Sequence, residues 1–183
     1  MTDVSRRAVF LSAGLAVLPA AALAQAPRGG MAAFGPAELQ HATNTGAVGA
    51  VALQTSRIAL DKAGDAKVRS FAQSEVMEQE TVSRILTEHA QSLGQRLSPP
   101  APDPRMAPMI AALQRAPRGA GFDREYVRGQ IQGHEALLRI QEDYLRNPQN
   151  MHQKHVAMLS RGQIMDHLKA LRDMEGQLRT ASR

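Results

Sequence analysis

The chain has 183 residues, a length typical of one domain, and it contains no cysteine, which excludes disulfide frameworks, thiolate metal sites and cysteine nucleophiles. Aromatic residues make up only 3% of the chain, which argues against the stacking platforms that bind single-stranded nucleic acid. The formal net charge is +5, but the basic residues are scattered and commonly have an acidic neighbour within a turn, so we expect no nucleic acid as a partner.

Residues 1–24 are typical of an export signal. Arg6 and Arg7 form a basic head, an uncharged apolar run follows, and Ala22 and Ala24 complete a small-x-small cleavage site. The paired arginines also resemble a twin-arginine signal, with the general secretory route as the alternative. We expect cleavage after Ala24 and a periplasmic product. An uncleaved membrane anchor is the alternative, although the apolar run of ~16 residues is shorter than the ~20 that span a bilayer.

After a predicted flexible linker over residues 25–35, glycine, proline and capping residues divide the chain into helices. Pro36 suits the first position of a helix, and the helical pattern that it opens runs to about Lys62. Asp65 is the predicted N-cap of a second long helix, which Gly94 ends.

Residues 98–108 contain five prolines and therefore predict a connector rather than a helix. A short helix is expected over residues 109–116, at the end of this connector. The third long helix is expected to begin around Phe122 and to end at Asn147–Pro148, and the last helix is expected over residues 149–178.

Apolar side chains recur at spacings of three and four along the long helices, and no segment alternates with period two. The stripe of the second helix includes Val68, Ala72, Gln79, Val82, Leu86 and Leu93, and those of the third and fourth include His134 and His167. Short connections near Gly64 and at Asn147–Pro148 favour antiparallel pairs. The sequence therefore predicts an all-α fold for residues 36–183: an up-down four-helix bundle whose crossover carries a short helix between two hairpins.

Several blocks resemble the domain of unknown function 4142, a family of exported bacterial proteins with a ferritin-like four-helix fold. The most specific block is Gly-Phe-Asp-Arg-Glu-Tyr-Val at residues 121–127, followed by Gly133–His134. Residues 56–60, residues 68–72 and His167–Leu168 complete the resemblance. It implies an exported ferritin-like bundle and no established activity.

The chain departs from the pattern of this family at two places. Ala52 stands where members often carry a glutamate, and Glu78–Gln79 stands where they often carry Asp–His, whereas His134 and His167 remain. The resemblance therefore implies that part of any inherited set of metal ligands has been replaced.

A di-iron centre is not expected, because bundles of that kind use Glu-x-x-His motifs on two helices. The only such motif is Glu38–His41, at the start of the first helix, where we expect it at the surface. His152 and His155 form a further pair, for which we expect a solvated helix end.

A simpler candidate metal site consists of His134, His167 and Glu78, with a transition metal ion as the cofactor. Counted from the turn at Asn147–Pro148, the two histidines differ by ~9 Å in axial level at ~1.5 Å per residue, so their joint ligation is not assured.

The alternative for His134 is a buried neutral imidazole, hydrogen-bonded to Gln163, Gln79 or Tyr126, in a protein without a cofactor.

The sequence contains no nucleophile elbow and no phosphate-binding loop after a strand, so no catalytic residue is assigned. An enzyme that uses Glu78, Asp123 and His134 has no support from their spacing. The first hypothesis is a non-catalytic binding or interaction module of the cell envelope, whose partner is another envelope protein or a second copy of itself, with no stable membrane span after cleavage. The second is a degenerate ferritin-like protein that binds metal through its core histidines and has a redox or stress role.

Overall fold

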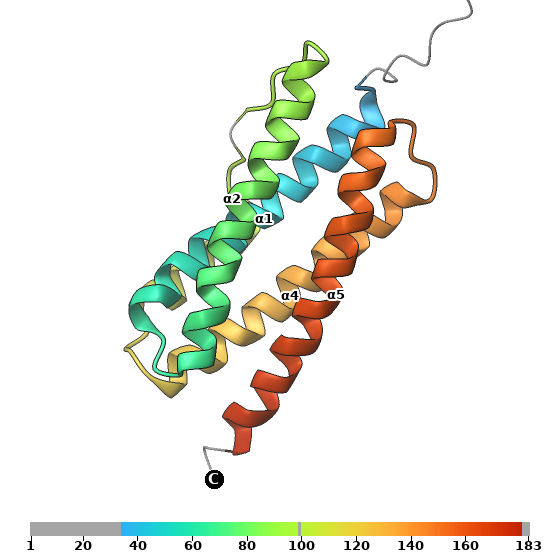
Figure 1. The fold of residues 1–183 in the computed structure, drawn as a ribbon. Helices are drawn as coiled ribbons and strands as arrows, with labels where there is room; N and C mark the ends of the chain where they lie inside the picture. The colour runs from blue at the N-terminus through green and yellow to red at the C-terminus, as the bar shows by residue number, and fades with distance from the viewer. Residues whose placement is uncertain (1–33, 99, 181–183) are drawn as a thin grey trace, which may run out of the picture. The chain divides into compact units, whose positions relative to one another are not determined.

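The computed structural model describes residues 34–98 and 100–180, so the predicted signal and most of the predicted linker lie outside the described residues. The described residues form helices and connections without a strand, which confirms the all-α prediction. The helices are α1 (Pro36–Lys62), α2 (Ala66–Ser92), the short 3-10 helix η1 (Pro104–Met106), α3 (Ala107–Arg115), α4 (Ala120–Leu145) and α5 (Met151–Thr180) (Figure 1). None of these helices is long and apolar enough to cross a membrane.

Local signals in the sequence set the first helix boundaries. Pro36 is the first residue of α1, and the Asp65 carboxylate accepts the backbone N–H groups of Lys67 at 2.7 Å and Val68 at 3.2 Å at the start of α2. Gly94 follows α2 with a φ of 75°, a left-handed conformation that glycine adopts without strain. These boundaries agree with the predicted ones.

The later boundaries differ from the predicted ones by one or two residues. α4 begins at Ala120 rather than Phe122, because Gly119 at a φ of 116° provides the turn that enters the helix. α5 begins at Met151.

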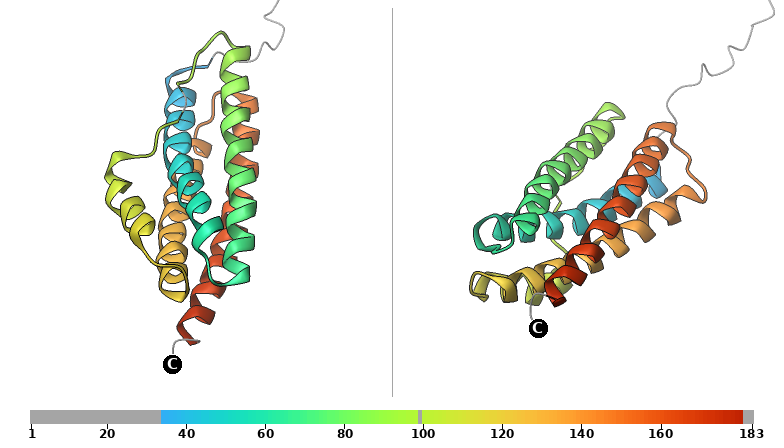
Figure 2. Two further views of the ribbon diagram at one scale, coloured as in Figure 1. Left: turned by 90° about the vertical axis from the view of Figure 1, so that its left-hand side faces the viewer. Right: turned by 60° about the horizontal axis from the view of Figure 1, so that its bottom comes forward.

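α1 packs against both α2 and α4, α4 packs against α5, and α2 also contacts α5. The short α3 lies outside this group, against α1 and α4 (Figure 2). The loop between α4 and α5 runs past the end of α4, so α5 begins beyond that end (Figures 1 and 2). This offset sets the level at which side chains of α4 and α5 meet.

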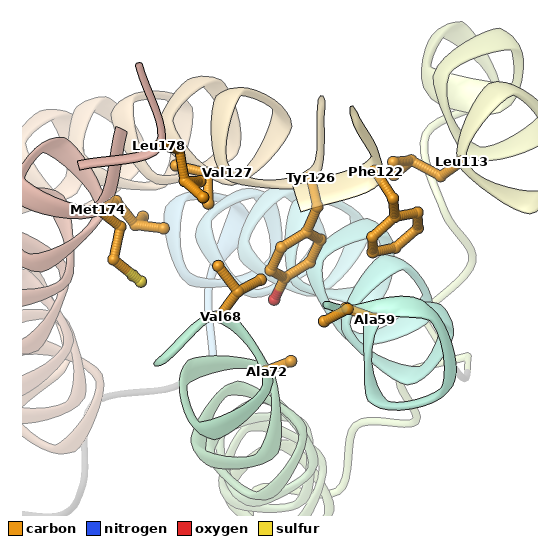
Figure 3. Close-up of a cluster of buried hydrophobic side chains, with 11 residues drawn as sticks. Ala59, Val68, Ala72, Leu113, Phe122, Tyr126, Val127, Met174 and Leu178 are labelled. Atoms are coloured by element: carbon orange, nitrogen blue, oxygen red, sulfur yellow. The ribbon is translucent and has the colours of Figure 1, made fainter. Parts of the chain in front are cut away.

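The main apolar core lies near the start of α4. It consists of Ala59, Ala63, Val68, Ala72, Leu113, Phe122, Tyr126, Val127, Leu171, Met174 and Leu178. Figure 3 shows Tyr126 of α4 pointing between Ala59 of α1 and Val68 of α2. Its hydroxyl lies 2.8 Å from the Ser56 hydroxyl, so this buried ring keeps a hydrogen bond.

The expectation that Glu38 and His41 lie at the surface is wrong, since their exposed fractions are 1% and 4%. The Tyr144 hydroxyl donates to Glu38 at 2.9 Å. The two ring nitrogens of His41 lie 2.7 Å from the side-chain amides of Gln141 and Gln153. Because α4 and α5 contribute these partners at the start of α1, the pair is buried and hydrogen-bonded instead of forming a solvated motif.

Candidate metal site

Three ligand-type side chains from three helices meet inside the protein: Glu75 of α2, His134 of α4 and His167 of α5. His134 Nε2 lies 3.1 Å from His167 Nδ1. Glu75 Oε2 lies 3.4 Å from His134 Nε2 and 3.2 Å from His167 Nδ1. The three atoms therefore form a nearly equilateral triangle. Glu75 and His134 are buried, and the His167 side chain is 17% exposed.

The backbone of α4 determines which nitrogen of His134 faces the triangle. His134 Nδ1 lies 2.8 Å from the backbone carbonyl oxygen of Gln130, which can only accept a hydrogen bond. Nδ1 therefore carries a proton, and Nε2 is the ring nitrogen that faces Glu75 and His167.

Neighbouring residues of α2 hold the outer atoms of the other two groups. Gln79 Nε2 donates to Glu75 Oε1 at 2.8 Å, and Glu78 Oε2 lies 3.2 Å from His167 Nε2. Glu75 Oε2, by contrast, is fully buried and has no hydrogen-bond partner among the described residues. Its contacts with the two imidazoles are within ion-pair distance but lack hydrogen-bond geometry.

Charge is concentrated in this cluster. Burial raises the pKa of the Glu75 carboxyl, but the interactions with His134 and His167 outweigh burial and lower that pKa to about 2. Burial lowers the pKa of His167, and the carboxylates of Glu75 and Glu78 reverse this effect and raise the pKa to about 9. At neutral pH without metal, the Glu75 carboxylate and the His167 imidazolium therefore lie together in the interior, beside the His134 ring.

The chain matches the family model described as "Domain of unknown function (DUF4142)" over residues 20–174. The chain belongs to this family. None of the curated proteins compared with it matches.

Two solved structures resemble this DUF4142 chain. A DUF305 fragment from Deinococcus radiodurans is 22% identical, with a TM-score of 0.67 over 79% of this chain and 96% of the other. A DUF305 protein from Streptomyces coelicolor, described as a candidate secreted protein, is 13% identical, with a TM-score of 0.68 over 78% of this chain and 93% of the other. At these identities the likeness shows the fold alone.

The structure of this DUF4142 chain brings His134 and His167 together, so the predicted axial separation of ~9 Å between them is wrong. That estimate assumed that α4 and α5 start level at their connection. The loop instead carries the chain past the end of α4 before α5 begins, and this offset removes the difference (Figure 1).

The third predicted ligand, Glu78, lies on the outer side of His167 rather than in the triangle. Glu75, which the sequence analysis did not select, takes that place. The sequence pattern does indicate that Glu75 is buried, because Glu75 lies three residues after Ala72 and four before Gln79 on the predicted stripe of α2.

The three residues predicted as hydrogen-bond partners of His134 have other roles. Tyr126 bonds to Ser56, and Gln79 bonds to Glu75. Gln163 is exposed, beside the groove between α2 and α5. The partners of His134 are instead the backbone carbonyl oxygen of Gln130 in α4 and the His167 ring of α5.

Asp123 does not belong to this site. Its buried carboxylate accepts the backbone N–H groups of Gly64 at 3.0 Å and Asp65 at 2.9 Å, and so ties the start of α4 to the α1–α2 connection. It precedes His134 by ~16 Å along the helix, at ~1.5 Å per residue.

Other candidate residues lie at the surface or outside the described range. His152 and His155 are exposed, as expected of a solvated helix end. The signal residues Arg6, Arg7, Ala22 and Ala24 lie outside the described residues.

Proposed function

We propose that this protein binds one divalent transition metal ion through Glu75 Oε2, His134 Nε2 and His167 Nδ1. The observation that carries the proposal is the triangle of donor atoms, with sides of 3.1, 3.2 and 3.4 Å. An ion ~2.05 Å from all three atoms, the distance typical of zinc–nitrogen bonds, would make angles of about 100–110° between them. These angles are close to tetrahedral.

An unpartnered carboxylate oxygen supports a cation at this cluster. Glu75 Oε2 is closed to solvent and lacks a hydrogen-bond partner among the described residues, which is costly for a buried carboxylate. A metal ion would accept a lone pair from this oxygen and, at the same time, one from His134 Nε2, which lies 3.4 Å away.

The donor set indicates the class of metal. Two imidazoles and one carboxylate suit zinc and other first-row divalent ions, and three protein ligands leave at least one coordination position open. A cavity of about 20 Å³ lies beside both histidines, which is room for one water molecule. The site thus has the composition of an exchangeable or reactive centre rather than of a closed structural one.

The proposal includes an exported protein of the periplasm with a ferritin-like four-helix bundle. The packing of α1, α2, α4 and α5 supports the bundle. The basic head and small-x-small motif of residues 1–24 support a cleaved signal peptide, of which the arginine pair favours the twin-arginine type.

The hypothesis of a non-catalytic interaction module with an envelope partner stays a prediction. The surface on which it would depend is a groove of about 310 Å³ between α2 and α5. Apolar side chains beside this groove are exposed: Met77 at 58%, Ile85 at 41% and Leu159 at 77%.

Metal analysis of protein purified without an affinity tag tests the metal proposal. After incubation with Zn²⁺ and dialysis, we expect about one ion per chain, as one such three-ligand site implies. We expect the His134→Ala variant to lose this ion and the His155→Ala variant, altered at an exposed histidine of α5, to keep it. Substoichiometric metal that His134→Ala does not change would refute the proposal.

A further inference from the structure

Gly49 lies buried in the middle of α1, a position at which glycine weakens a helix relative to alanine. A Cβ atom at this position would overlap Gln79 Oε1 of α2. The backbone of α1 therefore approaches the Gln79 amide more closely than any residue with a side chain would allow. Glycine at this position leaves room for that amide.

The Gln79 amide leads directly to the candidate metal site. Its oxygen lies against Gly49, while its nitrogen donates to Glu75 Oε1 at 2.8 Å. With Oε1 held in this way, the other carboxylate oxygen of Glu75 is the one that faces His134 and His167. The amide is thus held between the α1 backbone and the ligand that the site needs.

We propose that Gly49 and Gln79 are positioning residues of the metal site: Gly49 keeps the Gln79 amide on Glu75, and the amide turns a single oxygen of Glu75 toward the ion. This inference rests on the proposed function. Residues that orient metal ligands commonly change metal affinity ~10–100-fold when they are altered.

The Gly49→Ala substitution separates positioning from folding. The atom that a new Cβ would displace is the end of a flexible side chain, so Gln79 can turn away without disturbing either backbone. Alanine also favours the helix. The helix stabilisation by alanine and the loss of the Gln79 hydrogen bond to Glu75 are of similar size and opposite sign, so we expect the thermal midpoint of metal-free protein to change little, while the affinity for Zn²⁺ falls. A purely structural role of Gly49 would instead lower the thermal midpoint and leave the Zn²⁺ affinity of the folded protein unchanged.

The test is a cycle of Gly49→Ala, Gln79→Ala and the double variant, with Zn²⁺ affinity measured by competition with a chromophoric chelator. We expect each single variant to bind Zn²⁺ ~10-fold more weakly, and the double variant to bind no more weakly than Gln79→Ala alone. Gly162→Ala is the matched control, because Gly162 is exposed within α5 and a Cβ there meets nothing within 4 Å. Its affinity should equal that of the wild type.

Three results would overturn the inference. The first is a Gly49→Ala variant that binds Zn²⁺ as tightly as the wild type. The second is a Gly49→Ala substitution that weakens Zn²⁺ binding by the same factor in the Gln79→Ala background as in the wild type. The third applies if Gly49→Ala does not fold: a folded Gln79→Ala variant that keeps the wild-type affinity. A wild-type protein that binds neither Zn²⁺ nor Co²⁺ refutes the proposed function itself, and the inference with it. Failure of the metal site and failure of its positioning are therefore distinguishable.

Discussion

Replacing Glu75 by glutamine removes the buried negative charge and keeps the shape of the side chain. In the folded protein the pKa of the Glu75 carboxyl is about 2, against an ordinary value of 4.5. At ~1.4 kcal/mol per pKa unit, this difference means that the ionised carboxylate contributes ~3 kcal/mol to the free energy of unfolding. The contribution is fully present above pH 4.5 and is lost as the pH falls toward 2, because the folded-state pKa is the lower one.

We therefore expect Glu75→Gln to lower the free energy of unfolding of metal-free protein by ~3 kcal/mol at pH 7, with a deficit that shrinks as the pH falls through the range from 4.5 to 2. Urea unfolding followed by circular dichroism, in the presence of a chelator and at several pH values, measures the deficit and its dependence on pH. Glu80→Gln is the matched control, since Glu80 is an exposed residue of α2 whose ion pair with Arg57 is worth at most ~1 kcal/mol.

Two outcomes would contradict this reasoning. If Glu75→Gln and the wild type unfold within ~1 kcal/mol of each other at pH 7, the carboxylate does not gain from the two imidazoles what its lowered pKa implies. If the deficit stays constant down to pH 2, it comes from packing rather than from charge.

Two further substitutions separate the site from its scaffold. Glu78→Gln should weaken Zn²⁺ binding ~10-fold, because Glu78 holds the outer nitrogen of His167. Competition with a chelator measures this affinity, and an unchanged value would mean that Glu78 does not orient the ring. Asp123→Ala should lower the free energy of unfolding in urea by ~2–3 kcal/mol, because the N–H groups of Gly64 and Asp65 lose their acceptor. It should leave the Zn²⁺ affinity unchanged, and a loss of affinity would contradict the distance between Asp123 and the site.

The sequence predicts helix boundaries well where the deciding interaction is local. Pro36 at the start of α1, the Asp65 cap of α2 and the left-handed Gly94 each act within a few residues, so their effect can be predicted without a tertiary structure. The level at which α4 and α5 meet is different. It depends on how far the loop after α4 travels along the helix axis, and neither Asn147 nor Pro148 determines that distance.

Burial of polar side chains is the other quantity that hydrophobic periodicity misjudges. Glu75 occupies a position on the stripe of α2, between Ala72 and Gln79, but hydrophobic periodicity counts a glutamate as polar and so does not select it. The same bias placed Glu38 and His41 at the surface, although both are buried with hydrogen-bond partners.

Polar residues on apolar stripes carry more information when several helices are considered together. His134 lies between Ile131 and Leu138, and His167 lies between Ile164 and Leu171, each at spacings of three and four. A stripe position is buried by the packing of its helix, so each such residue needs hydrogen-bond or ion-pair partners to offset its desolvation. An acid on the stripe of α2 and histidines on the stripes of α4 and α5 provide partners for one another where these stripes meet, and this is why the candidate site lies in the interior rather than at the surface.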